Sequence, residues 1–278
     1  MKIRTLLPTA CAILLFASCG EDIEKSAHRF LDVANQCLSE GNYAEAKLQI
    51  DSIKMVYPKA FETRKEGIAL MRKVEMAEAE QTLAFTDSLL TTVRTQIDAM
   101  VPRFLFEKDE QYQEIGNFLS PSQRLENNLE RNYLRATVDE KGHMVLASLY
   151  RGSSYIHHKA IRVSVGDTYA QTPTSENLYE SSDALAKTER NDFSLGNDGG
   201  IIAFIALHAG ETVKVQYIGD KTYSTTLTRA DTRAIADVYA LAQLLQELVR
   251  LSDIEAEANR KISFIQSKDI ASEPQQAE

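Results

Sequence analysis

The sequence predicts an α+β protein in which helical segments flank an inserted β domain. Apolar residues recur at helical spacing over residues 24–60, and a seven-residue repeat runs through 61–100. Over 132–228 the pattern changes to short runs of alternating apolar and polar residues, which are typical of strands. Helical spacing returns over 229–267. The order helix, strand, helix therefore indicates a β domain placed between two long helices.

Composition excludes several classes of protein. The chain has 278 residues, of which 44% are apolar and 26% charged, as in ordinary globular proteins. This excludes a wholly disordered chain, a collagen and a multi-span membrane protein. With 31 Lys and Arg against 40 Asp and Glu, the net charge is −9, whereas a nucleic-acid binder needs a basic surface.

The N-terminus has the pattern of a signal peptide. Lys2 and Arg4 precede a mostly apolar run over 6–17, which is too short to span a bilayer. The run ends in Leu-Phe-Ala-Ser-Cys-Gly, with Cys19 after two small residues. This segment resembles the lipobox of bacterial lipoproteins, which implies cleavage before Cys19 and attachment of diacylglycerol to its thiol. The alternative is an ordinary secretory signal that is cleaved near Cys19 and leaves no lipid.

Removal of the signal at 1–18 changes the charge and the cysteine content. It takes away two basic residues and no acidic one, so the net charge becomes −11. Cys11 leaves with the signal and Cys19 carries the lipid, so Cys37 has no cysteine to pair with and is expected to be a buried apolar residue. We expect a protein of the cell envelope, anchored by lipid to the outer membrane on its periplasmic or surface face.

Residues 24–60 are predicted to form a helical hairpin within a helical domain at 19–131. Gly41 interrupts the first helix and Pro58 ends the second. The segment resembles a single tetratricopeptide repeat, and is similar to repeats in envelope lipoproteins of the outer-membrane assembly kind. The resemblance is carried by Phe30, Val33, Ala34, Cys37, Gly41, Tyr43, Ala46, Ile50, Ile53 and Pro58. One repeat forms no concave peptide groove, so the hairpin is either a cap on the rest of the protein or a docking surface.

Two long helices are predicted over 61–100 and 229–267. Each has an apolar stripe that needs a partner, and antiparallel pairing within the chain as a coiled-coil-like stalk is the simplest solution. The stripes are also compatible with pairing to another copy of the chain, as an oligomer, or to another protein. A shorter helical patch is expected near 112–119, and the polar tail at 268–278 is expected to be disordered.

The β domain at 132–228 is expected to hold about six strands in an antiparallel sheet or sandwich. A hairpin over 132–150 turns at Asp139–Gly142, and further strands are expected at 160–165, 213–217 and 223–227. The apolar run 200–208 predicts a central strand, and residues 167–190 are expected to form a long polar loop.

Motifs for catalysis and cofactor binding are weak. His143, His157, His158 and His208 lie in the β domain, but neighbouring residues of a strand face opposite ways, so no metal site is expected. We find no Gly-x-Ser-x-Gly elbow and no phosphate-binding loop, and we expect no cofactor. Candidate contacts to a ligand or partner are three tyrosines near loops of the β domain: Tyr155, Tyr169 and Tyr179.

Three hypotheses follow for function. The first is a non-enzymatic, membrane-anchored envelope lipoprotein that serves as a protein-interaction or structural module, with an envelope protein as its partner. The alternative is a lipoprotein whose β domain and tyrosine-bearing loop bind a glycan or a peptide. An enzyme is the third, and it would require histidine and carboxylates together in a cleft.

Overall fold

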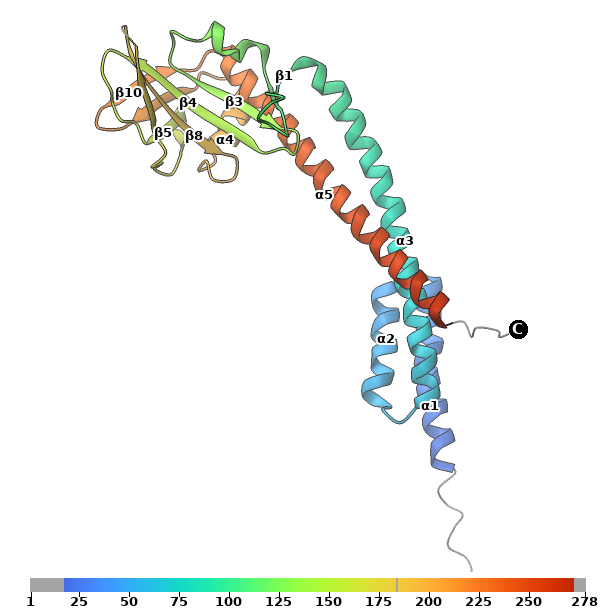
Figure 1. Cartoon of the computed structure of the whole chain (residues 1–278). Coiled ribbons are helices and arrows are strands. Elements are labelled where there is room, and N and C mark those ends of the chain that lie inside the picture. The colour runs from blue at the N-terminus through green and yellow to red at the C-terminus, as the bar shows by residue number, and fades with distance from the viewer. Residues whose placement is uncertain (1–17, 184, 273–278) are drawn as a thin grey trace, which may run out of the picture. The chain divides into compact units, whose positions relative to one another are not determined.

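A computed structural model describes residues 18–183 and 185–272, which form helices α1 to α5 and strands β1 to β10 (Figure 1). The chain divides into two compact units. Among the described residues, the helical unit comprises those up to Asp87 and those from Ile254 onward, and the β unit comprises those from Ser88 to Asp253. Helices α3 (Phe61–Met100) and α5 (Arg229–Ser272) each continue from one unit into the other. The β unit is therefore an insertion in the helical unit.

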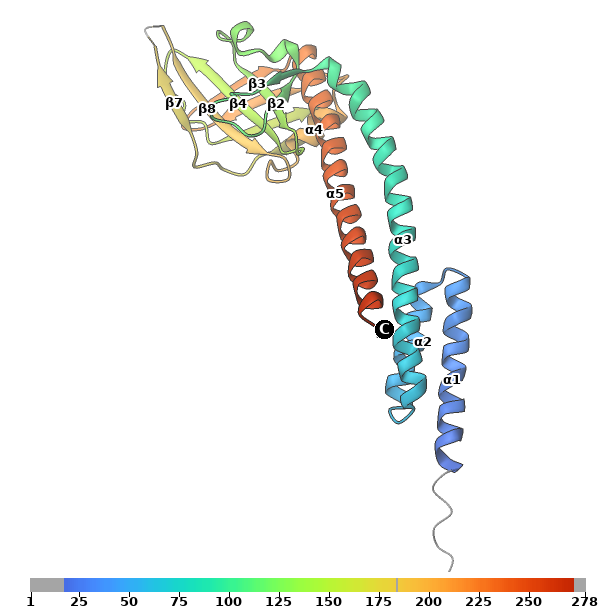
Figure 2. The ribbon, with the colours of Figure 1, turned by 45° about the vertical axis from the view of Figure 1, so that its right-hand side comes forward.

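Helices α1 (Ser18–Ser39) and α2 (Tyr43–Val56) form the hairpin predicted over 24–60 (Figure 2). Gly41 follows α1 with a φ of +74°, a left-handed conformation that glycine adopts without steric cost. Asn42 then caps α2, because its side chain accepts a hydrogen bond from the backbone amide of Glu45 at 3.3 Å. The sequence Gly-Asn thus determines both the end of one helix and the start of the next.

The helical unit has an apolar core of its own, formed by α1, α2 and the first turns of α3. Its buried residues are Ala27, Leu31, Ala34, Cys37, Ala46, Ile50, Ile53, Ala60, Leu70 and Val74. Gly67 of α3 packs against α2, where a Cβ would lie in ordinary van der Waals contact, 3.4 Å from Cγ2 of Ile50. Cys37 is buried and its thiol is free, as predicted.

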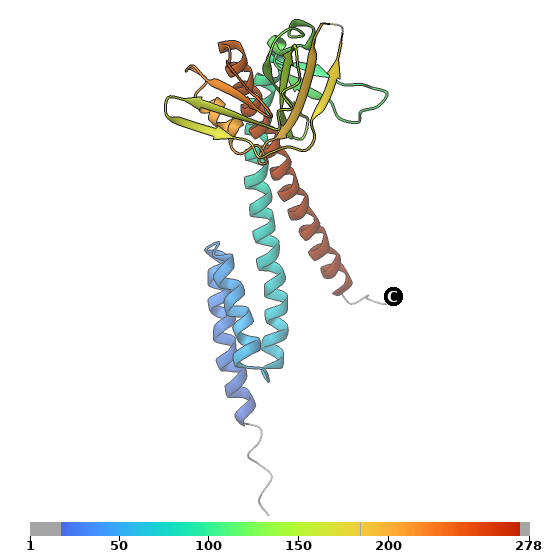
Figure 3. The same cartoon turned by 90° about the vertical axis from the view of Figure 1, so that its left-hand side faces the viewer.

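The β unit contains two antiparallel sheets (Figure 3). The larger sheet has the order β1-β2-β3-β4-β8-β7 and the smaller has the order β10-β9-β5-β6. The larger sheet is built from β1 (Leu105–Glu107), β2 (Asn117–Leu119), β3 (Tyr133–Asp139), β4 (Met144–Gly152), β8 (Lys187–Ser194) and β7 (Tyr179–Ser182). The smaller sheet is built from β10 (Thr222–Thr226), β9 (Lys214–Ile218), β5 (Ala160–Val165) and β6 (Thr168–Gln171).

One apolar core joins the two sheets to the helices of this unit. Leu134 and Leu146 from the larger sheet share it with Ile161 and Val215 from the smaller one. Helix α4 (Ile201–Leu207) adds Ile201, Ile202 and Ile205, and the core also includes Leu90, Val93 and Ile97 of α3 with Val238, Leu241 and Leu245 of α5. Because strand side chains alternate, the opposite face of the larger sheet is free to carry polar residues.

The predicted fold class is confirmed, but three parts of the β unit differ from prediction. The helical patch expected near 112–119 is not helical and ends in β2, and β1 lies before it at 105–107, where no strand was expected. The apolar run 200–208 forms α4 and not a strand. The expected polar loop at 167–190 contains β6, β7 and the start of β8, so the described residues of 132–228 hold eight strands and not about six.

The two long helices occur where they were predicted, and they contact each other within the chain. Helix α5 extends to Ser272, so 268–272 are helical where a disordered tail was expected. In the β unit, Leu90 of α3 and Leu241 of α5 belong to one core. In the helical unit, Nζ of Lys261 lies 3.3 Å from a carboxylate oxygen of Glu78.

The predicted signal peptide at 1–18 lies outside the described residues except for Ser18, where α1 begins, and Cys19 lies in the first turn of that helix. Within 18–183 and 185–272, no helix combines the length and the apolar character needed to cross a bilayer.

Candidate functional site

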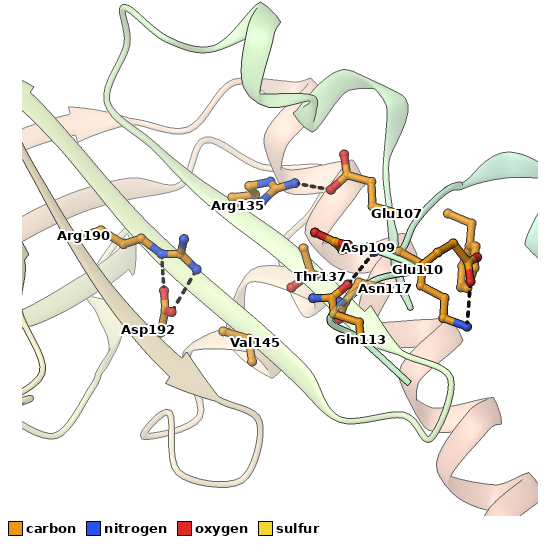
Figure 4. A pocket seen from close by; sticks show the side chains of 12 residues that line it. Glu107, Asp109, Glu110, Gln113, Asn117, Arg135, Thr137, Val145, Arg190 and Asp192 are labelled. Carbon is orange, nitrogen blue, oxygen red and sulfur yellow. Dashed lines mark hydrogen bonds and ion pairs between the residues drawn. The ribbon is translucent and has the colours of Figure 1, made fainter. Parts of the chain in front are cut away.

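A groove of about 900 Å³ lies on the face of the larger sheet that points away from the shared core (Figure 4). Arg135 and Thr137 of β3 line it together with Arg190 and Asp192 of β8, and Val145 of β4 lies between them. Alternation along the strands produces this face, because the intervening residues of β3 are buried. The segment that contains β1 and β2 forms the remaining wall, through Phe106, Glu107, Lys108, Asp109, Glu110, Gln113 and Asn117.

Strand register brings together groove residues that are far apart in the sequence. Arg135 lies opposite Ala147 of β4, and Ala147 lies opposite Asp192. Thr137 lies opposite Val145 in the next row. The small side chain of Ala147 thus separates a basic residue from an acidic one. Antiparallel pairing across β3, β4 and β8 therefore determines the pattern of charge in the groove.

Most charged side chains of the groove form ion pairs with one another. Nη2 of Arg135 lies 2.9 Å from Glu107, and Arg190 binds both carboxylate oxygens of Asp192 at 2.8 and 2.9 Å. Lys108, Asp109 and Glu110 add further charges of both signs. Small-molecule pockets are mostly apolar with a few polar groups. A wide groove of mixed, paired charges is better suited to the polar surface of a protein.

The structure does not bring the three predicted tyrosines together. Tyr155 lies in the loop after β4 and stacks on His157, with ring centroids 5.7 Å apart. Tyr169 is exposed on β6 of the smaller sheet, where the guanidinium of Arg162 lies 4.6 Å from its ring. Tyr179 is exposed on β7, and none of the three lines the groove. Tyr179 lies opposite Arg190 in the register of β7 and β8, which places it beside the groove.

A buried carboxylate organises the loop that leads into β5. Glu189 of β8 accepts hydrogen bonds from the backbone amides of Ile156, His157 and His158 at 2.6 to 2.9 Å. It also binds Nδ1 of the His158 ring at 2.6 Å. Burial alone would raise the pKa of Glu189, but these hydrogen bonds together hold it below its ordinary value. Glu189 is therefore ionised inside the sandwich, and its bonding capacity is fully used.

Ser148, His158 and Glu189 have the spacing of a serine–histidine–acid relay. Ser148 Oγ lies 2.8 Å from Nε2 of His158, whose Nδ1 binds Glu189. The three residues have no exposed surface, whereas a nucleophile must reach its substrate. Asn191 extends the network by donating from its side-chain amide to the carbonyl oxygen of His158 at 2.5 Å. The geometry therefore supports a structural role, in which the network fastens the loop before β5 to strands β4 and β8.

His157, Glu180 and Glu189 place potential metal-ligand atoms within 4.8 Å of one another. His157 already binds Glu180 through Nδ1 at 2.6 Å, and Glu189 already accepts four hydrogen bonds. A cation would have to displace several of these bonds. The cluster is explained by the contacts that it makes, and we assign it no metal.

Sequence reasoning missed the groove residues on strands, above all Arg190 and Asp192. The alternation of β8 is hidden in the sequence because its core-facing residues Glu189 and Asn191 are polar too. A turn signal at Asp183, whose side chain accepts from the backbone amides of Leu185 and Ala186, could have identified the hairpin of β7 and β8. Comparison of the chain with protein-family models, curated proteins and solved structures gives no match.

Proposed function

We propose that the chain is a non-enzymatic, lipid-anchored protein of the bacterial envelope that binds a protein partner through the groove of the β unit. The observation that carries the binding role is the groove itself, with its paired charges from Arg135, Glu107, Arg190 and Asp192. Complementary charges on a partner would re-pair with these groups and set the register of the complex. The observation that carries the anchor is the resemblance of residues 15–20 to a lipobox.

The lipid anchor is tested by metabolic labelling with a fatty acid and by the mass of the Cys19 peptide. We expect label on the wild-type chain and none on Cys19→Ala. Cys11→Ala and Cys37→Ala are matched controls that keep the label, because their thiols are not at the predicted cleavage site. Label that persists on Cys19→Ala would contradict the anchor.

The groove is tested by photo-crosslinking in cells, with a photoreactive amino acid at position 137 on β3. We expect one crosslinked protein of defined mass, and we expect Arg135→Glu with Arg190→Glu to reduce it about tenfold or more, because a reversed charge repels the partner. Arg162→Glu on the smaller sheet is the control and leaves the crosslink unchanged. A crosslink that survives the double charge reversal would contradict this role for the groove.

The alternative is binding of a glycan or a peptide by the tyrosines. It is favoured by one observation, the position of exposed Tyr179 beside Arg190 at the edge of the groove. In the same experiment, loss of the crosslinked product with Tyr179→Ala, but not with Tyr155→Ala or Tyr169→Ala, would identify Tyr179 as part of the binding surface. A product of glycan composition would select the alternative over a protein partner.

A further inference from the structure

The helical unit contains a second groove, of about 510 Å³, between α2, α3 and the last turns of α5. Its floor is apolar and includes Ile50 of α2, Ile68 and Met71 of α3, and Phe264 of α5. Ile68 is 59% exposed and Phe264 is 61% exposed. Large apolar side chains with that much exposure, gathered in one concave site, indicate a surface that another molecule covers.

The spacing of the lining residues is that of a helix-binding groove. On α3 they recur at 64, 68, 71 and 75, on α2 at 50 and 54, and on α5 at 264 and 268. Steps of three and four residues place each row on one face of its helix. The α3 row covers about 16 Å at 1.5 Å per residue, which matches about three turns of a docked helix.

The rim of this groove is basic, in contrast to the chain as a whole. Lys54, Arg64 and Lys268 line it, and among the described residues none of the three forms an ion pair. Arg64 donates only to the backbone carbonyl of Pro58, at 2.8 Å. Asp51 and Glu75 are the acidic residues at the groove, whereas over the whole chain acidic residues outnumber basic ones by 40 to 31. The local excess of positive charge favours an acidic occupant.

We propose that this groove binds an amphipathic helix of another protein, about three turns long, with acidic residues beside its apolar face. The apolar face packs on Ile68, Met71 and Phe264, and the acidic residues pair with Lys54, Arg64 and Lys268. A membrane surface fits less well, because the apolar residues line a concavity and Asp51 and Glu75 would face anionic headgroups. The site lies in the helical unit and is independent of the groove in the β unit.

Two synthetic peptides test this proposal. Each has about 11 residues, or three helical turns, with leucine at helical spacing, and glutamate flanks the leucines in one and lysine in the other. Binding to the full chain, held in zwitterionic nanodiscs so that no detergent competes, is followed by fluorescence anisotropy. We expect the acidic peptide to bind about tenfold more tightly than the basic one, since several partly exposed ion pairs contribute modestly each.

Three variants identify the groove as the binding site. Ile68→Glu with Phe264→Glu should weaken binding of the acidic peptide about tenfold or more, because charge enters the apolar floor. Phe85→Glu is the matched control, an exposed residue of α3 outside the groove, and should leave binding unchanged. Lys54→Glu with Lys268→Glu should reverse the preference towards the basic peptide. Circular dichroism checks that each variant keeps its helix content.

The proposal is overturned by equal affinity for the two peptides, or by binding that the floor variants do not weaken. It is also overturned if the acidic peptide does not bind, whereas vesicles of anionic lipid bind the wild-type chain and do not bind the double variant Ile68→Glu with Phe264→Glu. That result would assign the surface to a membrane.

Discussion

Glu189 shows how one buried side chain can determine the course of a whole segment. Its two oxygens bind three consecutive backbone amides and the ring of His158, and His157 between them adopts a φ of +50°. A non-glycine residue in that region is uncommon and must be held there by its surroundings. Glu189 supplies that support, which explains why a carboxylate lies in the core of the sandwich.

The buried His158 makes stability depend on pH. Burial lowers its pKa and outweighs the hydrogen bond to Glu189, so the folded state keeps the ring neutral. The unfolded chain takes up this proton near the ordinary pKa of about 6.5 and the folded chain does not. The contribution of His158 to the free energy of unfolding is therefore complete above about pH 6.5, and it is lost as the pH falls below that value. We expect the free energy of unfolding of the β unit to decrease from pH 7 to pH 5, and to decrease less in His158→Asn.

The control for this prediction is the neighbouring His157. The pKa of His157 is raised by the hydrogen bond to Glu180. Its contribution to the free energy of unfolding is therefore present below about pH 6.5 and is lost as the pH rises. His157→Asn should therefore make the decrease on acidification slightly steeper, the opposite of His158→Asn. Urea unfolding at each pH, followed by near-ultraviolet circular dichroism, reports on the β unit because nine of the eleven tyrosines belong to it. Equal slopes in wild type and His158→Asn would contradict the assignment.

At the scale of elements, the long helices and the hairpin could be predicted because their patterns are long and regular. Helix α3 begins and ends at the predicted residues, Phe61 and Met100. Short elements could not be predicted as well. Strand β8 has polar residues on both faces, since the core-facing Glu189 and Asn191 satisfy the His158 network. The apolar run 200–208 fits a strand or a helix, and only its buried set, Ile201, Ile202 and Ile205, has helical spacing.

Asp198 determines the start of α4. Its side chain is buried, and it accepts hydrogen bonds from the backbone amides of Ile202 at 2.8 Å and Gly196 at 3.2 Å. We expect Asp198→Ala to lower the free energy of unfolding by about 0.5–2 kcal/mol, as for loss of a helix cap. Asp220→Ala removes an exposed acid in a turn and should change it by less than about 0.5 kcal/mol. Equal free energies of unfolding for the two variants, measured by urea unfolding, would contradict this role of Asp198.

The groove of the β unit could be predicted only in part, because its residues come from both predicted and unpredicted strands. Arg135 lies in a strand predicted from the sequence, but Glu107, its partner, lies in a segment for which no strand was predicted. Asp192 becomes a neighbour of Arg135 only through the register of three strands. The three predicted tyrosines share only their position near loops, and that position does not show on which sheet each one lies.

At the scale of the whole molecule, two separate cores predict two separable unfolding transitions. The core of the helical unit and the core of the β unit share no residue. Ile53 is 1% exposed in the first, so Ile53→Ala should destabilise the helical unit by about 2–5 kcal/mol. Hydrogen exchange should then show lost protection in 23–80 and unchanged protection in β3, β4 and β8. Equal loss in both units would indicate one cooperative transition.

The insertion of the β unit has a consequence for synthesis of the chain. All of 88–253 leaves the ribosome before Phe264 and Lys268, which complete the groove of the helical unit. The hairpin core of 27–74 is available much earlier, so the wall that α5 supplies is the last part of the groove to arrive. A polypeptide truncated anywhere in the β unit would lack that wall. The groove would therefore mark chains whose translation has passed through the β unit into the end of α5.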